Sequence, residues 1–294
     1  MIHDVMLIGP ACRDENIDYD KTVVRGVGGA VYFCAFAVRA SGADVFSAVK
    51  INAADTDILD AFETDDAHIA LLPSRLTTLM RNTYTTATRE TRIAECLAQS
   101  DPILPSEIPH EQASIYHLAG LLYGDFPLEL ITALAERGKV SADIQGFLRH
   151  NENGSMNFHD WDVKLEYLKY FDFLKTDAAE AKILTGTEDR LEAARQLHAW
   201  GAKEIVITHN TEVLAYDGET AYTCPIKARN LSGRTGRGDT TMGAYLGCRA
   251  KGLSIPESLR FATACVSLKM EKPGPVRASR ADVDAYLDEF YSES

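Results

Sequence analysis

Apolar and polar positions alternate along most of the chain in a regular order. Short apolar runs, typical of buried strands, are followed by longer segments in which apolar residues recur at helical spacing. This order is characteristic of βαβ units and a parallel sheet. The expected strands are Val5–Ile8, Val45–Val49, Ile115–Leu118, Val140–Ile144, Phe171–Leu174 and Glu204–Thr208. The expected helices are Ala30–Ala40, Leu128–Arg137, Ala178–Leu184 and Leu191–Trp200. The pattern predicts an α/β fold with a doubly wound, mostly parallel sheet flanked by helices.

Two segments interrupt this alternation and predict a small second sheet. Residues 76–94 are rich in threonine, carry aromatic side chains and show no helical stripe, so they are expected to form a strand or hairpin. Residues 12–24, mostly polar, can pair with them as a lid on a single domain of residues 1–294. The exposed edge of this lid is a candidate contact for a homodimer. The polar segments Gly124–Pro127 and His150–Asp160 are expected to be loops.

Composition and charge narrow the range of partners. The chain has 294 residues, of which 46% are hydrophobic and 25% charged, as in ordinary globular proteins. The formal net charge of −13 disfavours nucleic acid and anionic membranes as partners. A few oriented donors can still bind one small phosphate compound, because they act at close range.

The cysteines, the histidines and the N-terminal segment carry weaker signals. The six cysteines contain no C-x-x-C pair and are expected to be reduced core residues. The eight histidines contain no H-x-x-x-H pair, so a structural zinc site is not expected. Residues Met1–Val5 lack a signal-peptide pattern, and no apolar run reaches the ~18 residues that span a bilayer. A cytoplasmic location is therefore expected.

A glycine-rich turn near the C-terminus carries the strongest chemical signal. Gly236 and Gly238 flank Arg237 directly before a segment of helical period. Backbone N–H groups at a helix N-terminus and the helix dipole together make such a turn an anion site. Asp239 lies in the first turn, where its carboxylate can act as a helix cap or as a base beside a bound phosphate. From these residues alone, an ordinary capped turn and a catalytic site remain open.

The run Thr235-Gly236-Arg237-Gly238-Asp239 resembles the second signature of ribokinase-like (PfkB) carbohydrate kinases, usually D-T-x-G-A-G-D. The resemblance implies that Asp239 is the catalytic base, that residues 236–238 form the anion hole, and that Thr235 contacts the nucleotide. Gly233 stands where the family commonly has Asp, and Arg237 replaces a small residue. The Arg237 guanidinium either reaches a phosphate or points into solvent.

The N-terminal third resembles the first signature of the same family. Gly26-Val27-Gly28-Gly29-Ala30 opens a helical stretch, and Phe33 stands where the family often has Asn. The resemblance implies that Gly28 and Gly29 approach the substrate and that Asp14 accepts hydrogen bonds from its hydroxyls. The alternatives are a helix packed through small residues and a solvated loop aspartate.

Lys175-Thr176-Asp177-Ala178-Ala179-Glu180 resembles the K-P-N-x-x-E segment of the family, which bears on Mg²⁺ and phosphate. It implies a nucleotide contact at Lys175 and a magnesium site at Asp177 and Glu180. These two carboxylates share one face of a helix start. An ordinary capping box at the same two residues is equally natural, and both can hold together.

Three further segments resemble parts of these kinases. Residues 204–218 resemble a nucleotide segment and imply contacts from Thr208 and Asn210, with Asn210 in place of a glycine. Residues 143–149 are similar to a D-x-Q-G-x-x-R run of members that include kinases of inositol-like substrates. Arg149 then contacts a phosphate or the substrate, the alternative being a surface salt bridge. Residues 262–274 resemble a stretch that closes over adenine and, in some members, a site for a monovalent cation.

Together these resemblances imply phosphotransfer from ATP, with Mg²⁺, to a hydroxyl of a small polyol, sugar or inositol. The threonine-rich lid offers many hydroxyl donors and few aromatic rings for stacking on a base, which favours a polyol or sugar. A nucleoside kinase of the same fold is an alternative. A non-catalytic binding protein is another, because several family positions are altered. A nicotinamide-dependent dehydrogenase is disfavoured, since no G-x-G-x-x-G follows the first strand.

Overall fold

The computed structural model describes residues 2–86 and 92–292 and contains two β-sheets. The main sheet has nine strands in the order β15-β14-β13-β12-β9-β8-β1-β4-β5. Their bounds are β15 Ala221–Pro225, β14 Glu212–Tyr216, β13 Glu204–Thr208, β12 Phe173–Asp177, β9 Lys139–Asp143, β8 Gln112–Leu118, β1 Ile2–Pro10, β4 Val45–Asn52 and β5 Ile69–Ser74. The strands from β13 to β5 are parallel, whereas β14 and β15 are antiparallel. The predicted doubly wound α/β fold is confirmed.

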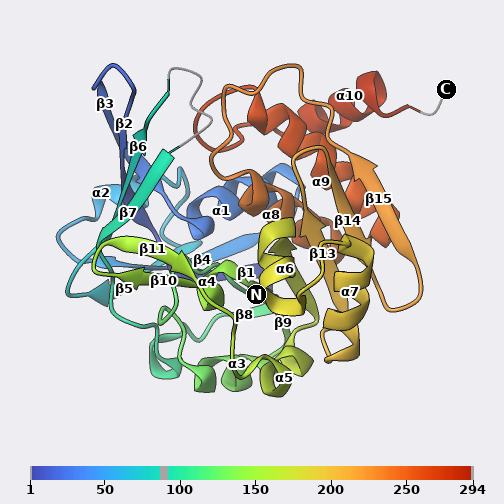
Figure 1. Cartoon of the computed structure of the whole chain (residues 1–294), viewed down its shortest axis with the longest axis horizontal. Helices are drawn as coiled ribbons and strands as arrows, with labels where there is room; N and C mark the ends of the chain where they lie inside the picture. The colour runs from blue at the N-terminus through green and yellow to red at the C-terminus, as the bar shows by residue number, and fades with distance from the viewer. Residues whose placement is uncertain (1, 87–91, 293–294) are drawn as a thin grey trace.

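Helices cover both faces of the main sheet, as Figure 1 shows. Their bounds are α1 Ala30–Ala40, α2 Asp57–Asp60, α3 Leu128–Ala135, α4 Gln145–Leu148, α5 Lys164–Tyr167, α6 Ala178–Thr185, α7 Arg190–Ala199, α8 Arg237–Ala250, α9 Ile255–Met270 and α10 Arg280–Phe290. Short 3₁₀ turns lie at Pro105–Glu107 and Leu168–Tyr170. No helix among the described residues is both long and apolar enough to cross a membrane.

The core lies in two layers, one on each face of the sheet. Alternate residues of β1 enter different layers: Val5 and Leu7 pack with α1, α8 and α9, whereas Met6 and Ile8 pack with α3 and α7. Because both faces of this strand are buried, its sequence is a continuous apolar run rather than an alternating one. Burial on both faces is also the reason why short apolar runs in the sequence predicted strands of the main sheet.

The second sheet has six strands in the order β10-β11-β7-β6-β2-β3, and it projects to the left of the α/β body in Figure 1. The bounds are β2 Cys12–Ile17, β3 Val23–Gly28, β6 Thr78–Tyr84, β7 Arg92–Ala98, β10 Arg149–Glu152 and β11 Ser155–Phe158. Strand β2 pairs antiparallel with β3 and parallel with β6. Part of the lid segment 76–94, residues 87–91, lies outside the described residues.

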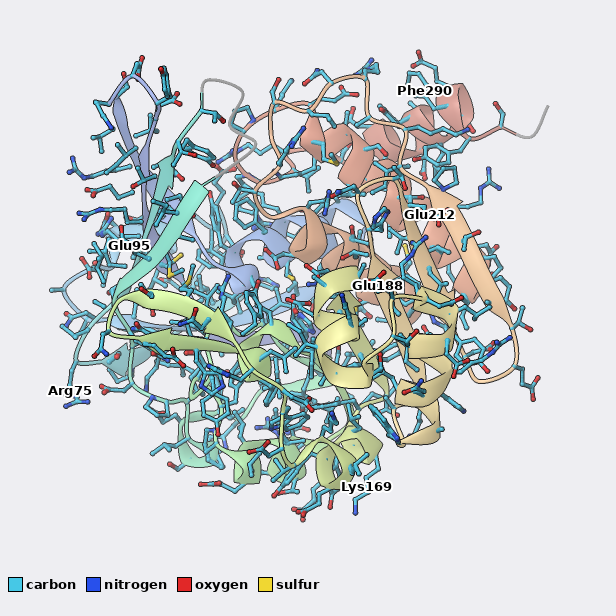
Figure 2. The ribbon with its side chains drawn as sticks, viewed as in Figure 1. Arg75, Glu95, Lys169, Glu188, Glu212 and Phe290 are labelled. Carbon is cyan, nitrogen blue, oxygen red and sulfur yellow. The ribbon has the colours of Figure 1, made fainter. Side chains whose placement is uncertain are left out.

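The expected loop at His150–Asp160 is wrong, because most of it forms the β10–β11 hairpin. The turn is Asn153-Gly154, whose φ angles of 54° and 96° suit the two residues of a tight hairpin turn. Strand β11 then pairs with β7 through Ser155 and Glu95. Glu95 lies at the left of Figure 2, across the molecule from Glu212 of β14.

Candidate active site

The parallel strands bring several predicted site residues to one edge of the main sheet. Asp143 is the last residue of β9, Asp177 the last of β12 and Thr208 the last of β13. In register, Lys175 pairs with Asp143, and Asp177 pairs with Thr208. The carboxyl ends of strands are where open α/β sheets bind ligands.

The glycine turn begins α8 against this edge. Gly236 has a left-handed φ of 77°, and a Cβ there would lie 2.3 Å from the Phe33 ring, so only glycine fits this turn. Gly238 faces the Lys175 ammonium, since a Cβ added at Gly238 would lie 3.1 Å from Lys175 Nζ. The first helical bond of α8 runs from the Thr240 N–H to the Gly236 carbonyl over 2.9 Å. The N–H groups of residues 237–239 precede it and have no partner within the helix, which is the arrangement that can bind an anion.

Asp239 lies in the first turn of α8 and is partly accessible. Burial raises the pKa of its carboxyl to about 6; Asp143 adds to the effect, and Lys175 opposes it. A carboxylate with that pKa is largely ionised at neutral pH and yet more basic than an ordinary aspartate. These are the properties of a general base that must accept a proton near pH 7.

Lys175 is buried at the centre of an acidic cluster. Its Nζ lies 2.9 Å from Asp143 Oδ2 and 3.8 Å from Glu180 Oε2. Burial alone would lower the pKa of Lys175, but Asp143, Glu180 and Asp239 outweigh it and raise the pKa. Lys175 is therefore a permanent positive charge beside the glycine turn at Gly238. Asp143, the first residue of the D-x-Q-G-x-x-R segment, holds this lysine, a role that the sequence pattern alone does not indicate.

Asp177 and Glu180 form a capping box at the start of α6. Asp177 Oδ1 accepts from the N–H groups of Ala179 and Glu180, both at 2.8 Å, and Glu180 Oε2 accepts from the Asp177 N–H at 2.8 Å. Burial raises the pKa of Glu180 to about 7, although Lys175 lowers it. Carboxylate oxygens at this edge fit Mg²⁺, which binds few protein groups and keeps several waters. The capping alternative is thus present, and it leaves the chemistry of a magnesium site in place.

The glycine turn is held by Lys269, a buried residue of α9 that sequence reasoning missed. Its Nζ donates to the Gly233 carbonyl at 2.6 Å and also to the Thr235 carbonyl. Burial lowers the pKa of Lys269 to about 8. A Cβ on Gly233 would lie 1.9 Å from the Lys272 carbonyl oxygen, so this position cannot hold the Asp that is common in the family. Lys269 lies within residues 262–274, the stretch that resembles an adenine-side segment, but that resemblance assigns it no contact.

Arg237 contacts the other altered position of the site. Its Nη1 donates to Asn210 Oδ1 over 2.8 Å, and burial lowers the pKa of the guanidinium. The side chain is therefore held at Asn210, two residues after the end of β13, rather than extending freely. Thr235 has an exposed side chain, and its carbonyl is the one that Lys269 holds.

The predicted substrate residues lie where the two sheets meet. Asp14 of β2 lies against Gly28 of β3, since a Cβ on Gly28 would be 2.2 Å from Asp14 Oδ2. Gly29 is the N-cap of α1. Arg149 is largely buried and donates from Nε to the Leu121 carbonyl at 2.8 Å. Burial lowers the pKa of the Arg149 guanidinium, whereas nearby carboxylates, which include Glu180 and Asp143, act to raise it.

Comparison with known proteins defines the class. The model of pfkB family carbohydrate kinases matches residues 4–281. A cytidine kinase from Thermococcus kodakarensis is 26% identical over 264 residues, which are 88% of this chain and 92% of that protein. A pyrophosphate-dependent kinase of the ribokinase family, solved with a pyrophosphate analog and myo-inositol, is 34% identical. It has a TM-score of 0.86, over 96% of this chain and 99% of that one. Ribokinase from Arabidopsis thaliana, solved with ribose and ATP, shares the fold at 17% identity and a TM-score of 0.75, over 98% and 99% of the two chains.

The fold and these relatives identify a small-molecule kinase. More particularly, the chain belongs to the pfkB family of carbohydrate kinases. This confirms the family inferred from the glycine turn and its aspartate.

Proposed function

We propose that the protein transfers a phosphoryl group to a hydroxyl of a small polyol, and that an inositol is the acceptor. The observation that carries the proposal is Asp239, with its pKa raised to about 6, at an anion-binding helix N-terminus above the buried Lys175. Support for an inositol comes from the relative solved with myo-inositol and from the D-x-Q-G-x-x-R segment that ends at Arg149.

In the proposed reaction, Asp14 and Arg149 orient the acceptor, and Asp239 accepts the proton of the attacking hydroxyl. A bond forms between that oxygen and the transferred phosphorus, while the bond to the leaving phosphate breaks. The N–H groups of residues 237–239 and the Lys175 ammonium stabilise the charge on the phosphate oxygens. Asp177 and Glu180 would hold Mg²⁺ through its water ligands, and the ion would supply positive charge that offsets part of the phosphate charge.

The proposed donor is ATP, as is general for the family, with pyrophosphate as a second candidate. One observation is the reason for considering pyrophosphate: Asn210 holds the Arg237 guanidinium beside the proposed anion site. Such a fork suits a compact polyanion, because it binds two phosphate oxygens at once. Three solved relatives at 33–35% identity are described as pyrophosphate-dependent kinases.

We also propose that the second sheet acts as the lid and as a dimer contact. Asp14 lies in β2, the strand that leaves the main sheet after β1 and joins the second sheet. Movement of the second sheet can therefore close the site and exclude water. Its edge strand β3 exposes Val23 and Val24, and exposed strand edges favour pairing between copies. Light scattering coupled to size exclusion, with Val24→Lys as the test variant, checks the dimer.

The experiment that tests the reaction is a matrix of donors and acceptors. ATP and pyrophosphate are each supplied with Mg²⁺ against myo-inositol, sugars and nucleosides that include cytidine, and phosphorylated product is measured. Turnover with an inositol, lost in Asp239→Asn, supports the proposal. Faster turnover with nucleosides would replace the acceptor class. Absence of turnover for every pair, with donor still bound, would favour a non-catalytic binding protein.

A further inference from the structure

The opposite edge of the main sheet carries a group of side chains that the kinase reaction does not use. His3 lies at the start of β1, Asp44 directly precedes β4, and His68 directly precedes β5. These three strands are parallel neighbours, so their amino ends meet at one place. The substrate and phosphate residues lie at the carboxyl ends of the strands, and the two sites are therefore separate.

The three side chains have their donor atoms directed at one another. His3 Nδ1 is 2.7 Å from Asp44 Oδ2, and His68 Nε2 is 3.2 Å from Asp44 Oδ1. One ligand atom from each of the three residues lies within 4.8 Å of the other two. Within residues 2–86 and 92–292, this is the one group of three or more such side chains that meets that geometry.

Two features resemble the supporting structure of a metal centre. His68 turns its second nitrogen to a carboxylate, with Nδ1 2.5 Å from Asp65 Oδ1, which leaves Nε2 directed at Asp44. Metal-bound histidines are oriented by such a second carboxylate. His3 is only 5% exposed and packs against the Phe46 ring with centroids 5.2 Å apart, so one ligand is fixed in the core.

We propose that His3, Asp44 and His68 bind a divalent transition metal ion, with Zn²⁺ as the best match. Two imidazoles and one carboxylate suit Zn²⁺ and other divalent first-row transition metal ions, whereas Mg²⁺ prefers oxygen ligands alone. Tetrahedral zinc with bonds of about 2.0–2.2 Å separates its ligands by roughly 3.3 Å. His68 Nε2 already has about that spacing from Asp44 Oδ1, and His3 Nδ1 has to move about 0.6 Å away from the other carboxylate oxygen, Asp44 Oδ2. Asp44 can make this shift because its side chain is 36% exposed.

The fourth coordination position faces solvent. The surface beside the cluster is a hollow whose lining includes Arg39, Glu63, Asp65 and His68. Asp65 is already bound to His68, so a water molecule is the expected fourth ligand. The ion would join chain positions 3, 44 and 68 and hold the amino ends of β1, β4 and β5 together, which stabilises the folded state by binding it selectively.

The test is metal binding by the full-length protein after treatment with a chelator. Titration with Zn²⁺, and with Co²⁺ for its visible absorption, is expected to give one equivalent bound and an increase in Tm. His68→Gln, at a partly exposed position that should fold normally, is expected to weaken binding at least tenfold and to remove the Tm increase. His3→Gln should do the same where it folds.

A matched control comes from the second sheet. His159 is exposed and pairs with Glu152 at 2.6 Å, outside any group of three ligands among the described residues. His159→Gln should leave the bound equivalent and the Tm increase unchanged. Equal zinc binding by wild type and His68→Gln, or no bound equivalent in the wild type, would overturn the proposal. Neither outcome depends on turnover, so the result is independent of the proposed kinase reaction.

Discussion

Replacing Asp239 by Asn separates the chemistry of the site from its binding of phosphate. Asn has nearly the same shape but cannot accept a proton. We expect kcat to fall by about 10²–10⁴-fold, the usual contribution of a positioned general base. The KM for the donor should change little, because the N–H groups of residues 237–239 and the Lys175 ammonium remain in place.

The same substitution should stabilise the protein. Burial raises the pKa of Asp239 from 3.8 to about 6, and each pKa unit corresponds to about 1.4 kcal/mol. Keeping this carboxylate ionised at pH 7 therefore costs at most about 3 kcal/mol. Asp239 is partly accessible to water, so a gain of about 1–2 kcal/mol and an increase of a few °C in Tm are expected for the variant.

The pH dependence of this gain has a definite sign. The folded state binds the Asp239 proton more tightly than the unfolded chain, so the cost of ionisation is fully present above the folded pKa of about 6. It decreases as the pH falls from 6 toward 3.8, and it vanishes below 3.8, where the carboxyl is protonated in both states. The variant should therefore lose its advantage in Tm between about pH 6 and pH 4.

Steady-state turnover, donor binding by calorimetry and thermal melts between pH 4 and pH 8 test these expectations together. Asp282→Asn, in the exposed first turn of α10, is the matched control and should leave turnover within twofold. Turnover of Asp239→Asn within tenfold of the wild type would refute its role as the base. Loss of donor binding in the variant would instead show that the carboxylate maintains the anion site.

Three further predictions concern the glycine turn and its neighbours. The wild-type kcat/KM should decrease about tenfold per pH unit below pH 6, because only ionised Asp239 is a base, and a pH–rate profile flat down to pH 5 would contradict this. Arg237→Ala should raise the KM of the preferred donor by about 10–100-fold, the value of one or two charge-assisted hydrogen bonds, with a smaller change in kcat. Lys269→Met should lower the Tm and raise the donor KM, because two loop carbonyls lose their donor. Added K⁺ should restore part of the activity of Lys269→Met but leave the wild type within twofold, since the ammonium already binds the carbonyls of Gly233 and Thr235.

The main sheet was predictable because its strands are buried on both faces. Strand β13 and helix α1 have the predicted bounds, Glu204–Thr208 and Ala30–Ala40, and each is made almost wholly of buried residues. The β10–β11 hairpin was missed because most of its residues are polar and none of them is buried, so no buried apolar run reveals it. The Asn153-Gly154 pair was the available signal, and it should have outweighed polarity.

Within the candidate site, motifs identified residues but not the contacts between them. Asp239 and Lys175 were found in sequence segments 64 residues apart, and the fold brings them together through Gly238. Lys269 could not be found in this way, because the stretch 262–274 that contains it predicts no role for it and it binds carbonyls 34 and 36 residues away. Backbone groups carry no sequence signature, so a residue that binds them is visible only in three dimensions.

Two of the altered family positions, Phe33 and Gly233, are linked through Lys269. Phe33 lies directly beneath Gly236, and the Lys269 ammonium sits 5.4 Å from the centre of the Phe33 ring. Lys269 in turn binds the carbonyl of Gly233, the position at which the family commonly has Asp. Phe33, Lys269 and Gly233 thus support the same turn together, and we expect that changing one of them alone disturbs the others.

The contacts among Phe33, Lys269 and Gly233 weaken the alternative that the chain is a non-catalytic binding protein. That alternative rests on the altered family positions, if each of them indicates a lost active site. Gly233→Asp provides a direct test: a Cβ there would lie 1.9 Å from the Lys272 carbonyl, so restoring the family residue should destabilise the turn and reduce turnover. Improved turnover in Gly233→Asp would show instead that the turn has decayed. Because Lys269 holds the turn that presents Asp239, we expect the loss.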